Sequence, residues 1–281
     1  MRILVIGGNG FLGSHFSKFK SYYRDLGVEI FSTSEKIENQ EDLVHTDLIN
    51  FHAVIFCSGI VNIENCEENP TEAYWVNSKL PALIADKLAA TNTKFIYIST
   101  DAVFDGTIEF AAELDVTNPL SLYGESKLQG EKETLNASES NLVCRVNFVG
   151  KSPRNNSLLD YFLENLTSKK LTAGYRNVFF TPLYADDVVR GVIKLIQLDA
   201  KGIFHLVGDD RMSKFEFGQI VEKLLYQDSK FVIPEDFKNS VTSPKRSLDL
   251  SLSNKKARNM GIDFPSITSR LTELFENSTK G

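Results

Sequence analysis

The stretch VIGGNGFLG, residues 5–13, joins an apolar run at the N-terminus to a pattern typical of a helix. Its glycines Gly7, Gly10 and Gly13 have the spacing G-x-x-G-x-x-G. We expect the first to permit a tight turn, the second to let the backbone approach a pyrophosphate, and the third to let the helix pack against a sheet. The free N–H groups at the start of the helix would then face the phosphates. A dinucleotide-binding loop is the prediction, and a strand–turn–helix unit without a ligand is the alternative.

The apolar run before this loop is the first of six short apolar runs, a pattern typical of strands buried on both faces of a parallel sheet. The six runs cover residues 2–6, 28–31, 53–57, 94–99, 142–146 and 203–207. Helical patterns lie between them, most clearly at residues 70–91 and 121–137. This alternation predicts an α/β fold built on a Rossmann-type, doubly wound parallel sheet.

The alternation of strands and helices breaks after residue 150, which predicts two parts of unequal size. We assign residues 1–150 to an NAD(P)-binding Rossmann domain. Residues 151–281 are predicted to form mainly a smaller C-terminal lobe that binds substrate. Within them, the helical pattern YADDVVRGVIKLIQ and the apolar run after it predict that residues 178–207 return to the Rossmann domain.

Composition excludes several other classes of protein. The chain has 281 residues, a formal net charge of −6 and no block of Lys and Arg, so a nucleic-acid partner is not expected. No run approaches the roughly 18 apolar residues that a membrane span needs. Cys57, Cys66 and Cys144 form no C-x-x-C pair, and the four His residues lack metal-ligand spacing, so we assign neither a disulfide nor a metal. These features predict a cytoplasmic protein.

The end of the second predicted strand reads FSTSEK, residues 31–36. At this place NAD-binding sites commonly carry an acidic residue that binds the ribose hydroxyls, and no acidic residue obviously ends this strand. Ser32, Thr33 and Ser34 could instead bond a 2′-phosphate. Lys36 could neutralise its charge. We therefore predict NADP rather than NAD as the cofactor, with a plain loop as the alternative.

Small and polar residues elsewhere are placed to contact a dinucleotide. Cys57, Ser58 and Gly59 follow the run at 53–57, where small side chains let a dinucleotide pass close to the sheet. Asp47 could meet the edge of the adenine from the loop before that run. The remaining candidates for cofactor contact are Asn9, Phe11, Leu12, Leu48, Asn77, Ser99 and Val146.

The stretch YGESK, residues 123–127, places a Tyr and a Lys four residues apart, and therefore on one face of a helix. This pattern is frequent, and two unrelated residues on a surface helix would also produce it. The run at 94–99 leads into Thr100, whose hydroxyl would lie where ligands bind in an open α/β sheet. Tyr123 can then donate a proton to a carbonyl that accepts a hydride, while Thr100 hydrogen-bonds the same oxygen. Lys127 would lower the pKa of Tyr123 and hold the nicotinamide ribose.

Two longer stretches, STDAVFDG at 99–106 and NPLSLYGESKLQGE at 118–131, resemble the extended short-chain dehydrogenase/reductase superfamily. Within it, the chain is most similar to the dTDP-4-dehydrorhamnose reductase family, over nearly its whole length. The resemblance implies that a hydride passes from NAD(P)H to the 4-keto group of a nucleotide-linked 6-deoxy sugar. It implies Thr100, Tyr123 and Lys127 as the catalytic residues, with Tyr123 as the general acid.

The resemblance also implies how the substrate is bound. Asn77 would have a structural role near the active site, and RVNFVG at 145–150 would line the nicotinamide and the sugar. In related proteins the helices at 68–89 and at Tyr123 often form a dimer interface, so a homodimer is one assembly that the resemblance implies. The candidate substrate-binding residues are Asp101, Val103, Asn147 and Phe148.

Other reactions and roles are compatible with the same residues. The reductases usually have Trp where Phe148 stands, and the glycine loop has the form of the wider superfamily. A nucleotide-sugar 4-epimerase that holds NAD tightly is therefore one alternative, and a non-catalytic regulatory subunit that binds NAD(P) is another. Ala102 stands where dehydratases carry the second residue of an acidic pair, so dehydration is disfavoured. The sequence does not distinguish which nucleotide and which sugar are bound.

Overall fold

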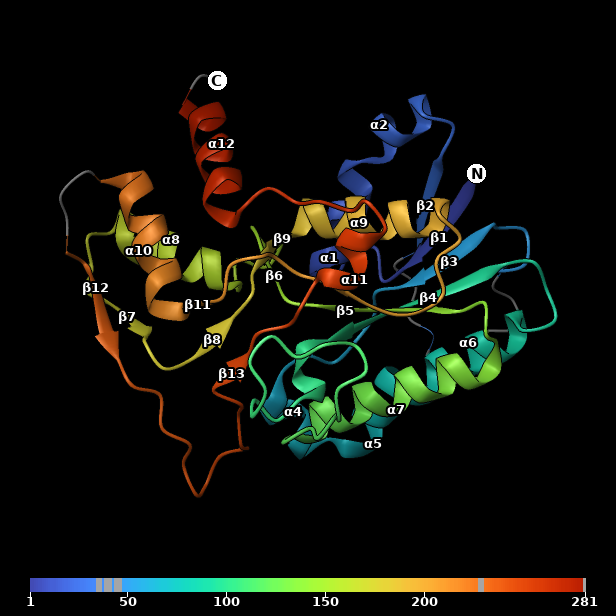
Figure 1. Cartoon of the computed structure of the whole chain (residues 1–281), viewed down its shortest axis with the longest axis horizontal. Helices are drawn as coiled ribbons and strands as arrows, with labels where there is room; N and C mark the ends of the chain where they lie inside the picture. The colour runs from blue at the N-terminus through green and yellow to red at the C-terminus, as the bar shows by residue number, and fades with distance from the viewer. Residues whose placement is uncertain (34–36, 38–41, 43–46, 227–229, 280–281) are drawn as a thin grey trace.

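A six-stranded parallel sheet forms the centre of the protein, shown as a computed structural model in Figure 1. The structure describes residues 1–281 except 34–36, 38–41, 43–46, 227–229 and 280–281. The strands lie in the order β10-β5-β4-β3-β1-β2, and each neighbouring pair is parallel, which confirms the predicted doubly wound sheet. Their bounds are β1 (Arg2–Ile6), β2 (Glu29–Thr33), β3 (Ala53–Phe56), β4 (Lys94–Thr100), β5 (Leu142–Val146) and β10 (Gly202–Leu206).

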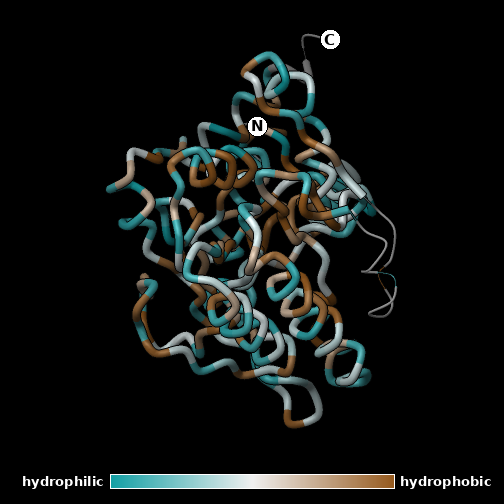
Figure 2. The backbone as a smooth tube through the Cα atoms, turned by 90° about the vertical axis from the view of Figure 1, so that its right-hand side faces the viewer, coloured by the Kyte–Doolittle hydropathy of each residue, from teal (hydrophilic) through white to brown (hydrophobic). Residues whose placement is uncertain are grey.

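Helices cover both faces of this sheet. Successive side chains of β1 pack on opposite faces of the sheet, because the side chains of a strand point to alternate sides. Val5 packs with α1 and α9 on one face, and Leu4 packs with α6 on the other, where α7 also lies. Apolar stretches, brown in Figure 2, run through the middle of the molecule, and all seven residues of β4 are buried. The bounds of these helices are α1 (Phe11–Lys18), α6 (Leu80–Leu88), α7 (Leu122–Ala137) and α9 (Ala185–Gln197), with α2 (Lys20–Asp25) after α1.

A smaller lobe is built from segments that follow β5, and Figure 1 shows it beside the central sheet. Its separate core includes Leu159, Phe162, Phe180 and Phe217, and its helices α8 and α10 pack on each other. The bounds of the elements after β5 and outside the central sheet are β6 (Phe148–Val149), α8 (Leu158–Thr167), β7 (Thr172–Tyr175), β8 (Phe179–Phe180), β9 (Leu183–Tyr184), β11 (Met212–Ser213), α10 (Lys214–Leu225), β12 (Val232–Glu235), β13 (Asp249–Leu250) and α12 (Ile267–Thr279).

The chain crosses between the lobe and the sheet more than once. α9 and β10 belong to the central layers, whereas β8 pairs with β11 and β13 in a small separate sheet. α11 (Lys255–Asn259) then returns to the central layers, where Ala257 and Ile262 join the cluster that contains Val188 of α9. The sequence did not predict this second return, because a five-residue helix carries too short an apolar pattern to identify its partner.

The helix predicted at residues 70–91 is three segments in the structure. It comprises α5 (Pro70–Tyr74), a π-helical turn η1 (Trp75–Lys79) and α6, and α4 (Ile63–Glu68) precedes it. A π turn admits an extra residue into the helix and re-aims the side chains around it. Asn77 lies within this turn and faces the loop after β3. Among the described residues, no helix is long and apolar enough to cross a membrane.

Candidate active site

The glycine loop depends on residues without side chains. Gly7 has a φ of +89°, which other residues rarely adopt, and the N–H groups of Gly7 and Gly8 donate to the Thr33 carbonyl at 3.1 and 2.9 Å. A Cβ atom on Gly13 would lie 2.1 Å from the Gly7 carbonyl oxygen. α1 therefore packs against the loop only because residue 13 is glycine. Gly10, the residue before α1, consequently lies on the wall of a cavity.

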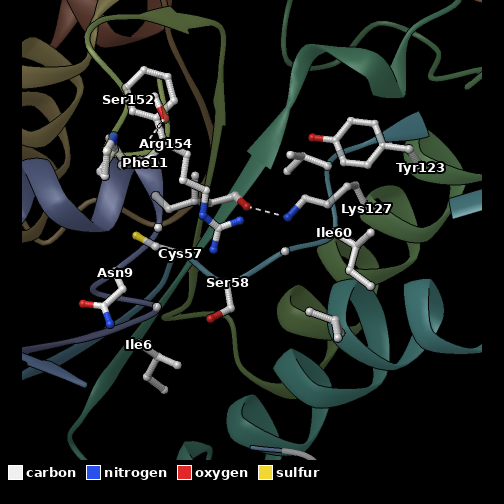
Figure 3. Close-up of a pocket in the computed structure, with 18 of the residues that line it drawn as sticks. Ile6, Asn9, Phe11, Cys57, Ser58, Ile60, Tyr123, Lys127, Ser152 and Arg154 are labelled. Atoms are coloured by element: carbon white, nitrogen blue, oxygen red, sulfur yellow. Dashed lines mark hydrogen bonds between the residues drawn. The ribbon is translucent and has the colours of Figure 1, made fainter. Parts of the chain in front are cut away.

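This first cavity has a volume of about 850 Å³ and lies beyond the carboxyl ends of β1, β3 and β4. Figure 3 shows Asn9 and Ser58 near one side of it and Tyr123 and Lys127 near the other, with Arg154 reaching between them. Its size is that of ordinary cofactor sites, and the N-terminus of α1, at Phe11, lies on its wall, where a helix N-terminus favours a phosphate. The predicted site residues that line it are Gly7, Asn9, Gly10, Phe11, Leu12, Cys57, Ser58, Gly59, Tyr123, Lys127 and Phe148.

The end of β2 supplies part of the predicted 2′-phosphate site. The Ser32 hydroxyl lies 3.2 Å from that of Ser17 on α1, and the Thr33 carbonyl is already bonded to the glycine loop. Ser34 and Lys36 lie outside the described residues. Binding of a 2′-phosphate by this segment therefore stays a prediction.

Several predicted ligand contacts are absent from the lining of this cavity, among them Asp47, Leu48, Val103 and Val146. Leu48 and Val146 are buried in the two clusters that flank the sheet, and Val103 is 0% exposed beside Phe104 and Leu252. These three side chains face the core and not the cavity, so contact with a ligand through their backbone atoms stays a prediction. Asp47 is exposed and its carboxylate accepts from Asn50, both contacts at 3.1 Å, so its predicted approach to adenine has no support from the cavity wall.

Asn77 positions the cavity wall rather than lining it. Its side-chain oxygen accepts from the Ile60 N–H at 2.9 Å, and its nitrogen donates to the Ile60 carbonyl and to the Ser126 hydroxyl, each at 3.0 Å. These bonds tie the loop after β3 to α7, which carries Tyr123. The implied structural role of Asn77 is therefore the one its contacts support, and direct cofactor contact is not.

The Thr100 hydroxyl joins the candidate catalytic residues. Thr100 ends β4, and Tyr123 lies in the first turn of α7, whose N-terminus is capped by the Ser121 hydroxyl. The Thr100 hydroxyl donates to Asp101 at 3.0 Å and also hydrogen-bonds Tyr123. Asn147 donates to the second carboxyl oxygen of Asp101. Burial raises the pKa of Asp101 to about 6, although the bond from Thr100 opposes this.

Lys127 lies on the face of α7 that packs against the sheet, and its side chain is buried there. Its ammonium donates to the Ile98 carbonyl at 2.7 Å and lies 4.0 Å from the centroid of the Tyr97 ring. Burial lowers the pKa of Lys127 to about 7, against the attraction of the Glu131 carboxylate one turn away. Because its bonded carbonyl lies on the cavity wall, the ammonium is positioned for a ligand in the first cavity.

The expectation that Lys127 lowers the pKa of Tyr123 is wrong for this structure. Burial raises the pKa of Tyr123 well above its ordinary value, and the hydrogen bond with Thr100 only opposes that rise. Desolvation disfavours the phenolate more than any neighbouring group stabilises it. Tyr123 is therefore held protonated, as a proton donor needs to be.

A buried ion pair lies behind Lys127. The Arg145 guanidinium donates to both carboxyl oxygens of Glu131, at 2.8 to 3.2 Å, and both side chains are 2% exposed. The Ser99 hydroxyl donates to the same carboxylate at 2.5 Å. Ser99 was predicted to contact cofactor, but its hydroxyl instead helps to join α7 to β4 and β5. Arg145 also donates to the Glu113 carbonyl at 3.4 Å.

A second cavity of about 500 Å³ lies between the Rossmann part and the lobe. Ala102 and Ser121, neighbours of the catalytic residues in the sequence, form part of its wall, and Leu158 lines both cavities. Its remaining wall includes the aromatic side chains Tyr161, Phe162, Tyr175 and Phe237 and the cationic side chains Lys214, Lys245 and Arg246. The candidate catalytic set therefore lies near the junction of the two cavities.

The lobe contributes residues to the first cavity, and the sequence left Arg154 open between contact with a substrate diphosphate and a solvated surface position. Arg154 lies on the loop between β6 and α8 and lines that cavity, and no ion pair to its guanidinium is present among the described residues. The loop is held by the Asp160 carboxylate, which accepts from the N–H groups of Ser152 and Ser157 at 2.9 and 3.0 Å. The signal in the sequence was the cationic residues Lys151 and Arg154 in the polar stretch KSPRNNS, residues 151–157, which is also typical of an ordinary surface loop.

Replacing Lys127 by Met is expected to flatten the pH dependence of stability above pH 7. An unfolded Lys keeps its proton up to about pH 10.5, whereas Lys127 in the fold loses it near pH 7, so the unfolded state binds more protons between these values. The free energy of unfolding should thus rise from pH 7 to pH 9, by roughly 1–3 kcal/mol more in the wild type than in Lys127→Met. Urea unfolding at both pH values measures this, and parallel profiles would contradict it.

The fold and the cavity beside the glycine loop define a protein of the extended short-chain dehydrogenase/reductase class, with the predicted Thr, Tyr and Lys at the cavity wall or beside it. Residues 1–280 match the family model described as the RmlD substrate binding domain. The chain belongs to this family, which confirms the resemblance read from its motifs.

Curated relatives and solved structures agree with this assignment. The chain is 27% identical to the probable low-salt glycan biosynthesis reductase Agl14 of Haloferax volcanii, over 98% of this chain and 92% of the relative. It is 30% identical to methionine adenosyltransferase 2 subunit beta of Xenopus tropicalis, over 76% and 69%. A dTDP-4-dehydrorhamnose reductase structure from Clostridium acetobutylicum has a TM-score of 0.84 at 25% identity and covers all of both chains. One from Bacillus anthracis in complex with NADP has a TM-score of 0.86 at 21% identity, over 98% and 99%.

Proposed function

We propose that this protein is an NAD(P)H-dependent reductase that acts on the 4-keto group of a nucleotide-linked 6-deoxy sugar. The observation that carries the proposal is that Tyr123, which bonds Thr100, lines the cavity beside the glycine loop, while Ala102 and Ser121, close to these residues in the chain, line the cavity against the lobe. Relatives named as sugar-nucleotide or glycan reductases support it. A reductase of this kind needs two adjoining sites, because a hydride must pass directly between cofactor and substrate.

Different residues of the chain would donate the proton, orient the donor and hold the cofactor. The reduced nicotinamide, when bound, supplies the hydride. Tyr123 donates its proton to the carbonyl oxygen as negative charge develops there, and Thr100 bonds Tyr123 and so orients the hydroxyl. Lys127 holds the ribose hydroxyls through an ammonium fixed by the Ile98 carbonyl. Phe148, in edge contact with Phe11 at 4.9 Å between ring centroids, closes the first cavity near the glycine loop.

The second cavity has the chemistry of a site for a nucleoside diphosphate. Tyr175 and Phe237 contact each other edge to face at 5.3 Å between centroids, and aromatic faces of this kind stack on a base. Lys245 is exposed on the cavity wall, where its ammonium can reach a diphosphate. Arg246 beside it is paired with Glu64 of α4, which joins this wall to the Rossmann part.

The experiment that tests the proposal follows absorbance at 340 nm with purified protein, NADPH or NADH, and a panel of nucleotide-linked 4-keto-6-deoxy sugars. Loss of absorbance that depends on one sugar is the expected result, with NADPH preferred over NADH. Co-purified NAD⁺ with no net nicotinamide consumption would instead identify a 4-epimerase. Cofactor binding without turnover on any sugar would contradict both.

The second candidate is a regulatory subunit that binds NAD(P), favoured by the similarity to proteins named as a subunit of methionine adenosyltransferase 2. Several large apolar side chains on one loop are exposed, as a surface for a protein partner would require, and they are Ile108, Phe110, Leu114 and Val116. The intact Thr100, Tyr123 and Lys127 set favours the enzyme. A homodimer stays a prediction.

Replacing Arg154 by Met is expected to weaken NADPH binding by roughly 10- to 100-fold, the loss of one or two charged hydrogen bonds. The reason is that Arg154 reaches into the first cavity (Figure 3), opposite the N-terminus of α1, where the cofactor pyrophosphate is proposed to lie. The change in NADPH fluorescence on titration measures the dissociation constant.

Lys151→Met is the matched control for Arg154→Met. It removes one positive charge from the same loop, but the Lys151 side chain is exposed and does not line the cavity. Its dissociation constant for NADPH should stay within about twofold of the wild type. Equal weakening by both substitutions would mean that only the general charge of the loop matters.

A further inference from the structure

Lys214 is a half-buried cation that the reaction described above does not use. It is the first residue of α10, and its ammonium lies 3.3 Å from the centroid of the Phe180 ring in the lobe. The side chain forms part of the wall of the second cavity. Among the residues that the structure describes, no hydrogen bond or ion pair to this ammonium is present, and its ring contact with Phe180 is accompanied only by the longer-range attraction of Asp101. A desolvated ammonium without a partner is costly, so its position calls for a ligand.

The Asp101 carboxylate lies near enough to attract the Lys214 ammonium. Burial lowers the pKa of Lys214 to about 8, and the Asp101 carboxylate opposes this shift. Asp101 is in turn bonded to Thr100, which contacts Tyr123. Lys214 therefore extends from the lobe toward the part of the second cavity that adjoins the catalytic hydroxyls.

The charge of the nearby Asp101 carboxylate distinguishes between the two parts of a sugar nucleotide. A phosphate near Lys214 would gain from the ammonium and would also be repelled by the carboxylate. A sugar hydroxyl carries no charge, and its oxygen can accept from the ammonium without that repulsion. Lys245, exposed on the same wall, is the cation better suited to phosphate. The arrangement thus favours a neutral, hydroxyl-bearing group beside Lys214.

We propose that Lys214 is a specificity-determining residue that recognises the sugar, by donating a hydrogen bond to a hydroxyl oxygen next to the carbonyl that Tyr123 protonates. This inference rests on the proposed reductase function. The Phe180 ring supports the ammonium from below through a cation–π contact and aims it into the cavity. A substrate that lacks this hydroxyl would leave Lys214 desolvated and unpaired, and would be rejected for that reason.

The test compares binding of dTDP-rhamnose with binding of dTDP by isothermal titration, because neither ligand requires turnover. Lys214→Met should weaken dTDP-rhamnose by roughly 10- to 100-fold and leave dTDP within about twofold of the wild type. Lys245→Met is the matched control and should weaken both ligands by the same factor. NADPH titration of each variant shows that the cofactor site is intact, so that a folding defect is recognised.

Two outcomes would overturn the inference alone. If Lys214→Met weakened dTDP as much as dTDP-rhamnose, Lys214 would be a diphosphate ligand. If it weakened neither, the ammonium would contact no part of the substrate. Failure of the proposed function is distinct, since the wild type would then bind neither ligand and consume no NADPH with any sugar, and the inference would fall with it. Lys214→Arg, which keeps a donor, should restore part of the lost affinity for dTDP-rhamnose.

Discussion

Replacing Tyr123 by Phe is expected to lower kcat for sugar reduction by about 10²- to 10⁴-fold, the range that a general acid contributes. Phe keeps the ring but removes the hydroxyl that bonds Thr100. NADPH should still bind within about threefold of the wild type, because the glycine loop and Lys127 are unchanged. Stopped-flow absorbance at 340 nm and NADPH titration measure the two quantities separately.

The size of this effect follows from the environment of Tyr123. Burial holds its pKa above the ordinary value, so the hydroxyl keeps its proton over the whole working range of pH. Without it, the developing alkoxide would have to take a proton from water in a partly closed cavity. Thr100 is a poor substitute, since its hydroxyl proton is already donated to Asp101.

Tyr74→Phe is the control for this prediction. Tyr74 lies on α5 and is partly exposed, and its hydroxyl makes a long contact of 3.5 Å with Glu125. Its loss should leave kcat within about twofold of the wild type. A Tyr123→Phe variant that kept more than a tenth of wild-type kcat would show that another group donates the proton.

Replacing Arg145 by Met is expected to lower the free energy of unfolding by about 3–5 kcal/mol, the cost of leaving a buried charge without its partner. Glu131 would then keep only the Ser99 hydroxyl as a side-chain donor. Since Glu131 lies one turn from Lys127 on α7, the loss also disturbs the wall of the first cavity. Urea unfolding followed by circular dichroism measures the change.

Two controls identify burial as the cause. Arg176 pairs with Asp236 at 2.8 Å in a similar geometry, but these side chains are 61% and 41% exposed. Arg176→Met should therefore cost less than about 1 kcal/mol. The double variant Arg145→Met with Glu131→Leu should recover much of the loss, because it removes both buried charges. Equal costs for Arg145→Met and Arg176→Met would contradict the prediction.

The sheet could be predicted because its signal is local. Each strand is a short apolar run, and each is separated from the next by a helical pattern or a turn. The glycine loop is likewise contiguous, and its three glycines meet within a single turn. The short strands of the lobe, such as β8 and β13, were not predicted because two residues carry no periodic pattern.

Only the site residues that belong to a contiguous motif could be predicted from the sequence. Tyr123 and Lys127 share a helix face by spacing alone, and Thr100 follows a strand that the sequence shows plainly. The side chain of Val103 faces a core, which the sequence could not show, because an apolar residue beside a motif can face either a ligand or a core, and only packing decides which. The side chains of Leu48 and Val146 likewise face the core.

The sequence by itself determined the doubly wound sheet, the family, and the residues expected to carry the chemistry, because each is written in contiguous stretches. Only the tertiary structure brought Arg154 to the first cavity and Lys214 to the second, from loops and helices distant in the chain from the motifs. It also decided that Tyr123 keeps its proton and that Lys127 bonds a backbone carbonyl. The burial of a side chain and the direction in which it points depend on how remote segments pack. The spacing of residues within one segment does not determine them.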